Sequence, residues 1–288
     1  MLQGEYWFRG NKWPPADLSV PPPPPAFPTL QLPAPDYRYY AWSDYHYSIV
    51  ALSQFIHYNT STPQATLWYN IQLGNYPNPA AVAGELSELQ TLMDYRQGVM
   101  AEALAQRNNI VVFYAGLLTF GRSSHPATWR LAQIVSRVGQ FQAMYYKSQF
   151  NRPRASQVSP NLMPPIEVPG HASYPSGHAT ESRLLSNVLS QVMPAAVSQG
   201  LPGNLPGAYG AGRTASAYPY SWPQAALMRL AERIARNREV LGLHYPSDSK
   251  AGVYLADQTF VLLWPFLLTV TDTTTGTLLV DEARSEWQ

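Results

Sequence analysis

Three short segments carry the side chains best suited to chemistry, and the middle one spans residues 170–180 (GHASYPSGHAT). It ends in a glycine turn that leads into a predicted helix. Amide groups at a helix N-terminus point toward an anion, and Gly177 lets the backbone approach that anion closely. Ser176 adds a hydroxyl donor, and His178 adds a group that transfers protons near neutral pH. Taken alone, this pattern is equally typical of a plain turn with a helix cap.

The third segment, residues 237–250 (NREVLGLHYPSDSK), adds an arginine, a second histidine and a carboxylate. Arg238 and His244 lie six residues apart, so they share a broad face of a largely helical run. Pro246 starts a new helix and places Asp248 in its first turn. From there the carboxylate reaches back to the Nδ1–H of His244, which fixes the tautomer and leaves Nε2 free. Taken singly, a core histidine and a surface arginine are the commoner interpretations.

The first segment, residues 147–156 (KSQFNRPRAS), supplies further positive charge at a predicted helix end. Lys147 and Arg154 are seven residues apart, close to two helical turns, so both side chains can face the same way. Pro153 interrupts the helix between them, and Arg152 competes with Arg154 for the same role. The alternative is a solvated basic helix end, where cations favour the helix dipole.

Together the segments predict a site for a tetrahedral oxyanion of charge near −2. Cations neutralise such an anion, while amides and a hydroxyl satisfy its remaining oxygens. His244 would attack or coordinate the central atom, and His178 would stand opposite it as acid or base. A phosphate-binding protein without enzymatic activity would need only the cations, so the two histidines and Asp248 favour an enzyme.

The three segments also resemble the signature of a superfamily. It joins the type 2 phosphatidic acid phosphatases, the class A bacterial acid phosphatases and the vanadium-dependent haloperoxidases. The signature runs Lys, six residues, Arg-Pro; then Pro-Ser-Gly-His; then Ser-Arg, five residues, His, three residues, Asp. The resemblance covers residues 110–260, with Ala155 where proline is expected and Asn237 where serine is expected. The matching residues are Lys147, Arg154, Pro175, Ser176, Gly177, His178, Arg238, His244 and Asp248.

This resemblance implies a helical bundle with the site between helices and His244 as the covalent or coordinating ligand. In a phosphatase, His244 would be phosphorylated, and His178 would protonate the leaving alcohol and then activate water. In a haloperoxidase, vanadate would be coordinated by His244 and would react with hydrogen peroxide. His178 would form a hydrogen bond with the axial oxygen of the vanadate. His171, seven residues before His178, resembles a second histidine of bromide-using haloperoxidases, although a loop histidine without a role is the alternative.

The sequence therefore predicts a vanadium-dependent haloperoxidase-like enzyme. It would oxidise bromide or iodide with hydrogen peroxide, act on a small organic substrate, and use vanadate as its cofactor. The alternative is a soluble acid phosphatase that cleaves a phosphate monoester through a phosphohistidine at His244. Phosphate can occupy the same site as vanadate in either case.

The elements that must position these residues are predicted to be helices. Residues 80–108 contain strong helix formers and no internal proline, so they predict one long helix. Neither sustained strand alternation nor an internal repeat is present, which indicates an all-α chain folded as a bundle. The other predicted helices cover residues 40–58, 109–120, 127–150, 184–192, 224–241 and 246–268, with a Gly- and Pro-rich loop at 199–219.

Composition narrows the class of protein further. Charged residues make up 13% of the 288, about half of the usual ~25%, which predicts a homo-oligomer with a buried interface. The net charge of +1 argues against a nucleic-acid partner. Because the chain has no cysteine, disulfides, thiolate metal sites and cysteine nucleophiles are excluded.

The N-terminal region differs from the rest of the chain. Residues 1–36 are rich in proline, with an unbroken run at 21–25, which predicts a polyproline-like arm ahead of a catalytic domain at 37–288. The longest apolar run, residues 260–270, is too short to span a bilayer and contains Pro265. We therefore expect a soluble protein without a membrane partner. It would be cytoplasmic or, if a signal peptide has been removed, periplasmic or secreted.

Overall fold

The computed structural model describes residues 43–194, 226–272 and 275–288, which all belong to one compact unit, Tyr39–Gln288. The prediction of an all-α chain is confirmed. Throughout the described ranges the regular structure is helical, apart from an isolated β-bridge between Thr271 and Leu278. The predicted arm at 1–36 and the predicted loop at 199–219 lie outside the described residues.

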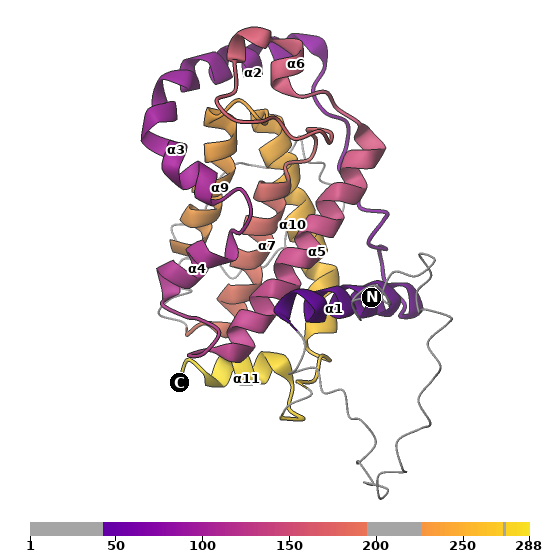
Figure 1. Ribbon diagram of the computed structural model, residues 1–288. Coiled ribbons are helices and arrows are strands. Elements are labelled where there is room, and N and C mark those ends of the chain that lie inside the picture. Colours follow the sequence, from indigo (N-terminus) through magenta and orange to yellow (C-terminus); the bar gives the residue numbers. More distant parts are fainter. Residues whose placement is uncertain (1–42, 195–225, 273–274) are drawn as a thin grey trace, which may run out of the picture. The chain divides into compact units, whose positions relative to one another are not determined.

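Figure 1 shows the helices of the described residues. In chain order they are α1 (Asp44–Ser61), α2 (Pro79–Leu92), the 3-10 helix η3 (Met93–Tyr95), α3 (Arg96–Ala105), α4 (Val111–Leu118), α5 (Pro126–Phe150), α6 (Ala155–Val158), the 3-10 helix η4 (Pro160–Leu162), α7 (Gly177–Val192), α9 (Ala226–Val240), α10 (Pro246–Leu267) and α11 (Leu279–Ser285).

Helix α7 forms the centre of the bundle and packs against α5, α9 and α10 (Figure 1). Almost every side chain along α7 is buried, so each of these side chains must be either apolar or hydrogen-bonded. Two glycines on its neighbours allow the close packing. A Cβ atom at Gly139 of α5 would lie 3.0 Å from the Cα of Glu181, and one at Gly252 of α10 would lie 2.6 Å from the carbonyl oxygen of Ser176.

Local chemistry sets where the helices that bear the site begin and end. Ser176 caps α7, since its hydroxyl accepts a hydrogen bond from the amide of Ala179. Pro246 occupies the first position of α10, where its missing N–H costs nothing. Helix α5 ends at Asn151, which adopts a left-handed conformation (φ 45°) and turns the chain. These boundaries bring all three signature segments to one end of the bundle.

Most of the long predicted helices are confirmed within a few residues, but residues 80–108 do not form one continuous helix. Helix α2 ends at Leu92, the 3-10 helix η3 follows, and α3 continues from Arg96. The Arg96 guanidinium donates hydrogen bonds to the carbonyls of Val240, Met163 and Leu162, at 3.0, 2.9 and 2.6 Å. We attribute the break to these tertiary contacts, which outweigh the helical propensity of the segment.

No helix in the described part of the chain is both long enough and apolar enough to cross a membrane.

Candidate active site

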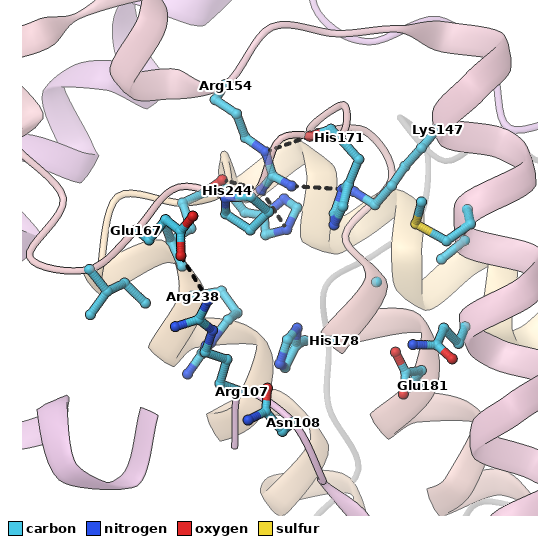
Figure 2. Close-up of a pocket in the computed structure, with 17 residues that line it drawn as sticks. Arg107, Asn108, Lys147, Arg154, Glu167, His171, His178, Glu181, Arg238 and His244 are labelled. Atoms are coloured by element: carbon cyan, nitrogen blue, oxygen red, sulfur yellow. Dashed lines mark hydrogen bonds and ion pairs between the residues drawn. The ribbon is translucent and has the colours of Figure 1, made fainter. Parts of the chain in front are cut away.

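A pocket of about 300 Å³ opens at the end of the bundle where the signature segments meet (Figure 2). Seven of the nine predicted site residues line it, whereas Ser176 and Asp248 lie behind its wall. In Figure 2, Arg154, His171 and His244 lie along one side, and His178 faces them across the pocket. The seven are Lys147, Arg154, His171, Gly177, His178, Arg238 and His244.

Lys147 reaches the pocket from the last turn of α5, and its side chain is almost fully buried. Its ammonium donates hydrogen bonds to the carbonyls of Ala172 (2.8 Å) and Ser173 (2.9 Å). Burial and the positive charge of Arg154 hold the pKa of Lys147 well below its usual range. The two carbonyls therefore satisfy donors of the ammonium without neutralising its charge.

Arg154 precedes α6, and its guanidinium connects both neighbouring site segments. Nη1 donates to the carbonyl of Leu243 (2.7 Å) and to Nε2 of His244 (3.1 Å), and Nε donates to the carbonyl of His171 (3.1 Å). Burial lowers the pKa of Arg154 to about 10, although Asp248 opposes that shift. Arg154 is thus the arginine of its segment that lines the pocket.

Arg152, the rival from the sequence, is buried behind the pocket instead. Its guanidinium pairs with Asp248 (2.6 Å) and with Glu85 of α2 (3.1 Å). It also lies over the ring of Tyr245, 3.7 Å from the ring centroid. Glu85 in turn accepts hydrogen bonds from the amide and the hydroxyl of Ser247, at 2.6 and 2.8 Å. Arg152 and Glu85 therefore fix the start of α10, which carries Asp248.

The geometry around His244 determines its tautomer. Nδ1 donates a hydrogen bond to the Asp248 carboxylate (3.1 Å), while Nε2 accepts one from the Arg154 guanidinium. Nε2 therefore carries no proton, and Arg154 occupies its lone pair at the wall of the pocket. Burial and the charge of Arg154 hold the pKa of His244 well below its usual range.

Asp248 stays ionised despite complete burial. Burial alone would raise its pKa, but the hydrogen bond with His244 and the positive charge of Arg152 outweigh burial and hold the pKa well below the usual range. The carboxylate also accepts from the hydroxyl of Ser173 and from the amide of Tyr245 (3.0 Å). Asp248 thus orients His244 from behind the pocket, as the spacing of the two residues predicts.

His178 lies in the first turn of α7, and its ring forms a hydrogen bond with one backbone carbonyl. Its Nε2 lies 3.0 Å from the carbonyl oxygen of Gln106, which can only accept, so Nε2 carries the proton and Nδ1 bears the lone pair. Burial and then the charge of Arg238 lower the pKa of His178 to about 3. Asn237, which replaces the serine of the signature, donates to the side-chain oxygen of Gln106 (3.0 Å) and so supports this contact.

Arg238 completes the set of cations from α9. It is 2% exposed and donates to the carbonyl of Ala103, while its Nε–H is buried without any hydrogen-bond partner. Burial lowers its pKa to about 10. Among the described residues, neither Arg238 nor Lys147 nor Arg154 forms an ion pair with a carboxylate. The pocket therefore holds an excess of buried positive charge, which an anion would stabilise.

The remaining predicted residues take simpler places. Ser176 is fully buried, and its amide donates to the carbonyl of Asp248 (2.9 Å), so it joins the starts of α7 and α10. His171 is exposed at the pocket rim, and its Nδ1 lies 3.0 Å from Arg154 Nη2 and 3.2 Å from the carbonyl of Ala172. These two contacts require opposite roles of Nδ1. We assign it as acceptor, because Arg154 is always a donor and lies closer.

Several pocket residues were not predicted from the sequence. Glu181 follows His178 by three residues on α7, so helical spacing alone could have placed it on the same wall. Arg107 is paired with Glu167 at the rim (3.2 Å) and offers no such signal. An apolar side completes the wall, formed by Ala143, Met144, Ile166, Pro169 and Leu243.

No protein-family model matches the chain, and no curated protein matches it in sequence.

Proposed function

We propose that the chain is a vanadium-dependent haloperoxidase-like enzyme that oxidises bromide or iodide with hydrogen peroxide. One observation carries the proposal. Three buried cations that form no ion pair with a described carboxylate line one pocket with His244, whose Nε2 carries no proton. A tetrahedral oxyanion of high charge is the ligand that such a set of donors favours.

The donor set fits vanadate in number and in charge. Lys147, Arg154 and Arg238 would hold its oxygens, and the unpartnered Nε–H of Arg238 would gain an acceptor. The amide of Gly177, at the N-terminus of α7, would add a donor supported by the helix dipole. Nε2 of His244 would become free to hold vanadate if Arg154 exchanged its hydrogen bond with that nitrogen for one with an anion oxygen. Vanadate held there would supply a Lewis acid that activates peroxide while the vanadium keeps its oxidation state.

Other residues of the chain would orient His244, bind the incoming O–H group and receive the organic substrate. Asp248 keeps the proton on Nδ1 of His244, so Nε2 stays a ligand at all pH values at which Asp248 is ionised. His178 presents a lone pair on Nδ1 from the opposite wall and so accepts a hydrogen bond from an incoming O–H. The exposed apolar rim around Met144 would receive a small organic substrate.

His171 favours the haloperoxidase over other oxyanion chemistry. With Nδ1 accepting from Arg154, its Nε2 carries a proton at the pocket wall and can donate to a halide or to an oxygen atom. We propose further that the described helices are the bundle of the acid phosphatase and vanadium haloperoxidase superfamily, with the site at the N-termini of α7 and α10.

An acid phosphatase is the second candidate, and His244 is the observation that favours it. A neutral imidazole with a fixed tautomer, surrounded by cations, is equally suited to attack a phosphate monoester at phosphorus. Both chemistries would use the same residues, and inorganic phosphate would bind in the same pocket.

A paired assay tests the proposal. The purified protein is loaded with orthovanadate, and peroxide-dependent bromination of a phenol is measured beside hydrolysis of an aryl phosphate by protein without vanadate. We expect bromination that depends on vanadate and is inhibited by phosphate. Hydrolysis without bromination would reject the haloperoxidase in favour of the phosphatase, and the absence of both would reject the two candidates together.

A further inference from the structure

Glu181 stands between the active-site pocket and a second cavity. That side cavity measures about 350 Å³, is lined mainly by polar side chains, and shares one wall with the pocket. Figure 2 shows Glu181 on the same side of the pocket as His178. The residues common to both cavities are Arg107, Asn108, Gln140, His178 and Glu181.

The position of Glu181 is rigidly defined. Its Cα packs closely against Gly139 of α5, where an added Cβ would lie only 3.0 Å away. Oε2 accepts a hydrogen bond from the hydroxyl of Ser136 (3.1 Å), whereas no described residue forms a hydrogen bond with Oε1. Oε1 lies 4.0 Å from the point where a Cβ of Gly177 would stand, so it approaches the amides that would bind an oxyanion.

The groups that face this carboxyl adjust its proton affinity in opposite directions. Burial raises the pKa of Glu181 to about 7, while the Ser136 hydrogen bond and the positive charge of Arg137 on α5 oppose that rise. His178 lies one turn away on α7, and Arg107 faces both cavities from the chain between α3 and α4. Glu181 can therefore both hold and release a proton near neutral pH.

The proposed chemistry consumes one proton in each turnover. Peroxide, bromide and a proton give hypobromous acid and water: H₂O₂ + Br⁻ + H⁺ → HOBr + H₂O. Because His178 is a weak base in this protein, with a pKa of about 3, it is a poor source of that proton near pH 7. An ester hydrolysis has the same need, since the leaving alkoxide must be protonated.

We propose that Glu181 delivers this proton and regains it through the side cavity. The O–H bond of the Glu181 carboxyl breaks, and a new O–H bond forms on the peroxide oxygen that leaves as water. The carboxylate then takes a proton from solvent that enters along Gln133, Ser136 and Gln140. Protons and substrates would thus enter by different faces. This inference rests on the proposed function.

Proton uptake on anion binding tests the placement without requiring turnover. A dianion beside Glu181 raises its pKa, so binding of inorganic phosphate at pH 7 draws in about 0.4 of a proton for a rise of about one pKa unit. Calorimetry in buffers of different ionisation enthalpy measures this uptake. We expect Glu181→Gln to lose that fraction, because phosphate's own protonation contributes equally to both proteins.

Glu232→Gln is the matched control, because the pKa of Glu232 is also raised by burial but the side chain lines neither cavity. Its uptake should equal that of the wild type. Equal uptake in wild type and Glu181→Gln would overturn the inference while leaving the proposed function intact. Failure of phosphate to bind the wild type would overturn both.

The pH dependence of turnover supplies the second test. The wild-type rate should fall as pH rises above about 7, because the protonated carboxyl is the active form and the bound dianion raises its pKa further. Glu181→Gln should no longer show this limb of the pH–rate profile, and its rate should be about a hundredfold lower. Ser136→Ala keeps the carboxyl but removes the hydrogen bond that lowers its pKa, so its limb should move to higher pH. An unmoved limb in Ser136→Ala would contradict the proposal even if Glu181→Gln failed to fold.

Discussion

Two buried charge clusters near helices α7 and α10 differ in balance. The candidate active site lies at the N-termini of these helices, where three cations from neighbouring segments face a pocket without a carboxylate partner among the described residues. Further along the same helices, Arg183 and Asp257 form a paired bridge, with distances of 2.8 and 3.2 Å between guanidinium nitrogens and carboxylate oxygens. Asn187 adds a third hydrogen bond to that carboxylate (2.8 Å).

One cluster holds two helices together, whereas the other prepares a binding site. In the Arg183–Asp257 pair each charge has an opposite partner, so it fixes α7 against α10 and needs nothing from outside. The active-site cations are instead held by backbone carbonyls that leave their charges uncompensated. Sites for function commonly break such local rules at the expense of stability. Removing charge should therefore have opposite consequences in the two clusters.

The largest effect is expected at His244. Its replacement by alanine removes the group that would bond to the central atom of the oxyanion, so activity should fall by at least about a thousandfold. The exposed His57 of α1 provides the control, and His57→Ala should retain full activity. Steady-state rates of the three proteins make the comparison, and a retained rate in His244→Ala would remove His244 from the mechanism.

The Arg183–Asp257 pair should respond in stability rather than in binding. Asp257→Asn removes the charge that pairs with the buried Arg183 in this bridge, which should lower the free energy of unfolding by about 3–5 kcal/mol. Phosphate affinity of the folded protein should not change. The double variant Arg183→Met with Asp257→Leu should regain most of the loss in urea unfolding. An Asp257→Asn protein as stable as wild type would show that the pair is not structural.

Arg152 and Arg154 show the same contrast, between a charge that stabilises the fold and a charge in the pocket, within a single segment. Arg154→Met removes a pocket cation and should weaken phosphate binding about 10- to 100-fold with little loss of stability. Arg152→Met removes the ion-pair partner that Asp248 and Glu85 share, so it should lower the free energy of unfolding by about 3 kcal/mol and weaken binding less. Titration calorimetry and urea unfolding measure both. The reverse pattern would place Arg152 at the anion.

The smallest expected effect is the loss of folding stability at low pH that is due to His178. Unfolded His178 binds a proton below its ordinary pKa of 6.5, whereas the folded residue does so only near 3. Its contribution to stability is therefore complete above pH 6.5 and is lost as pH falls toward 3. At pH 5 the loss is about 2 kcal/mol. His178→Gln should lose less stability than wild type between pH 7.5 and 5 in urea unfolding, and an identical loss in both proteins would contradict the assignment.

Long, strongly patterned helices could be predicted from the sequence, and short or interrupted ones could not. Residues 127–150 fold as α5 almost as predicted, because proline and a left-handed asparagine mark its ends. The break at η3 depends on Arg96 reaching carbonyls in distant segments, which no local pattern records. Helices α6 and α11 are too short to give a periodic signal.

The same distinction holds within the site. Lys147, His178 and His244 were predictable because their spacing within short segments limits where they can lie. Their supports were not. Glu85 meets Arg152 from 67 residues away, and Gln106 meets His178 from 72 residues away. Only the packing of α2 and α3 against the bundle brings those groups into place.

Gly252 has a consequence for anyone who would redesign this protein. It does not line the pocket, yet α10 can approach the carbonyl of Ser176 only because no methyl group stands there. The hydrogen bond between the amide of Ser176 and the carbonyl of Asp248 spans the same junction. The Gly177–His178 turn and the His244–Asp248 pair are thus set at a fixed spacing by one missing side chain. A Cβ at this position would force the backbone of Ser176 or of α10 to shift, although every reacting group would stay chemically unchanged.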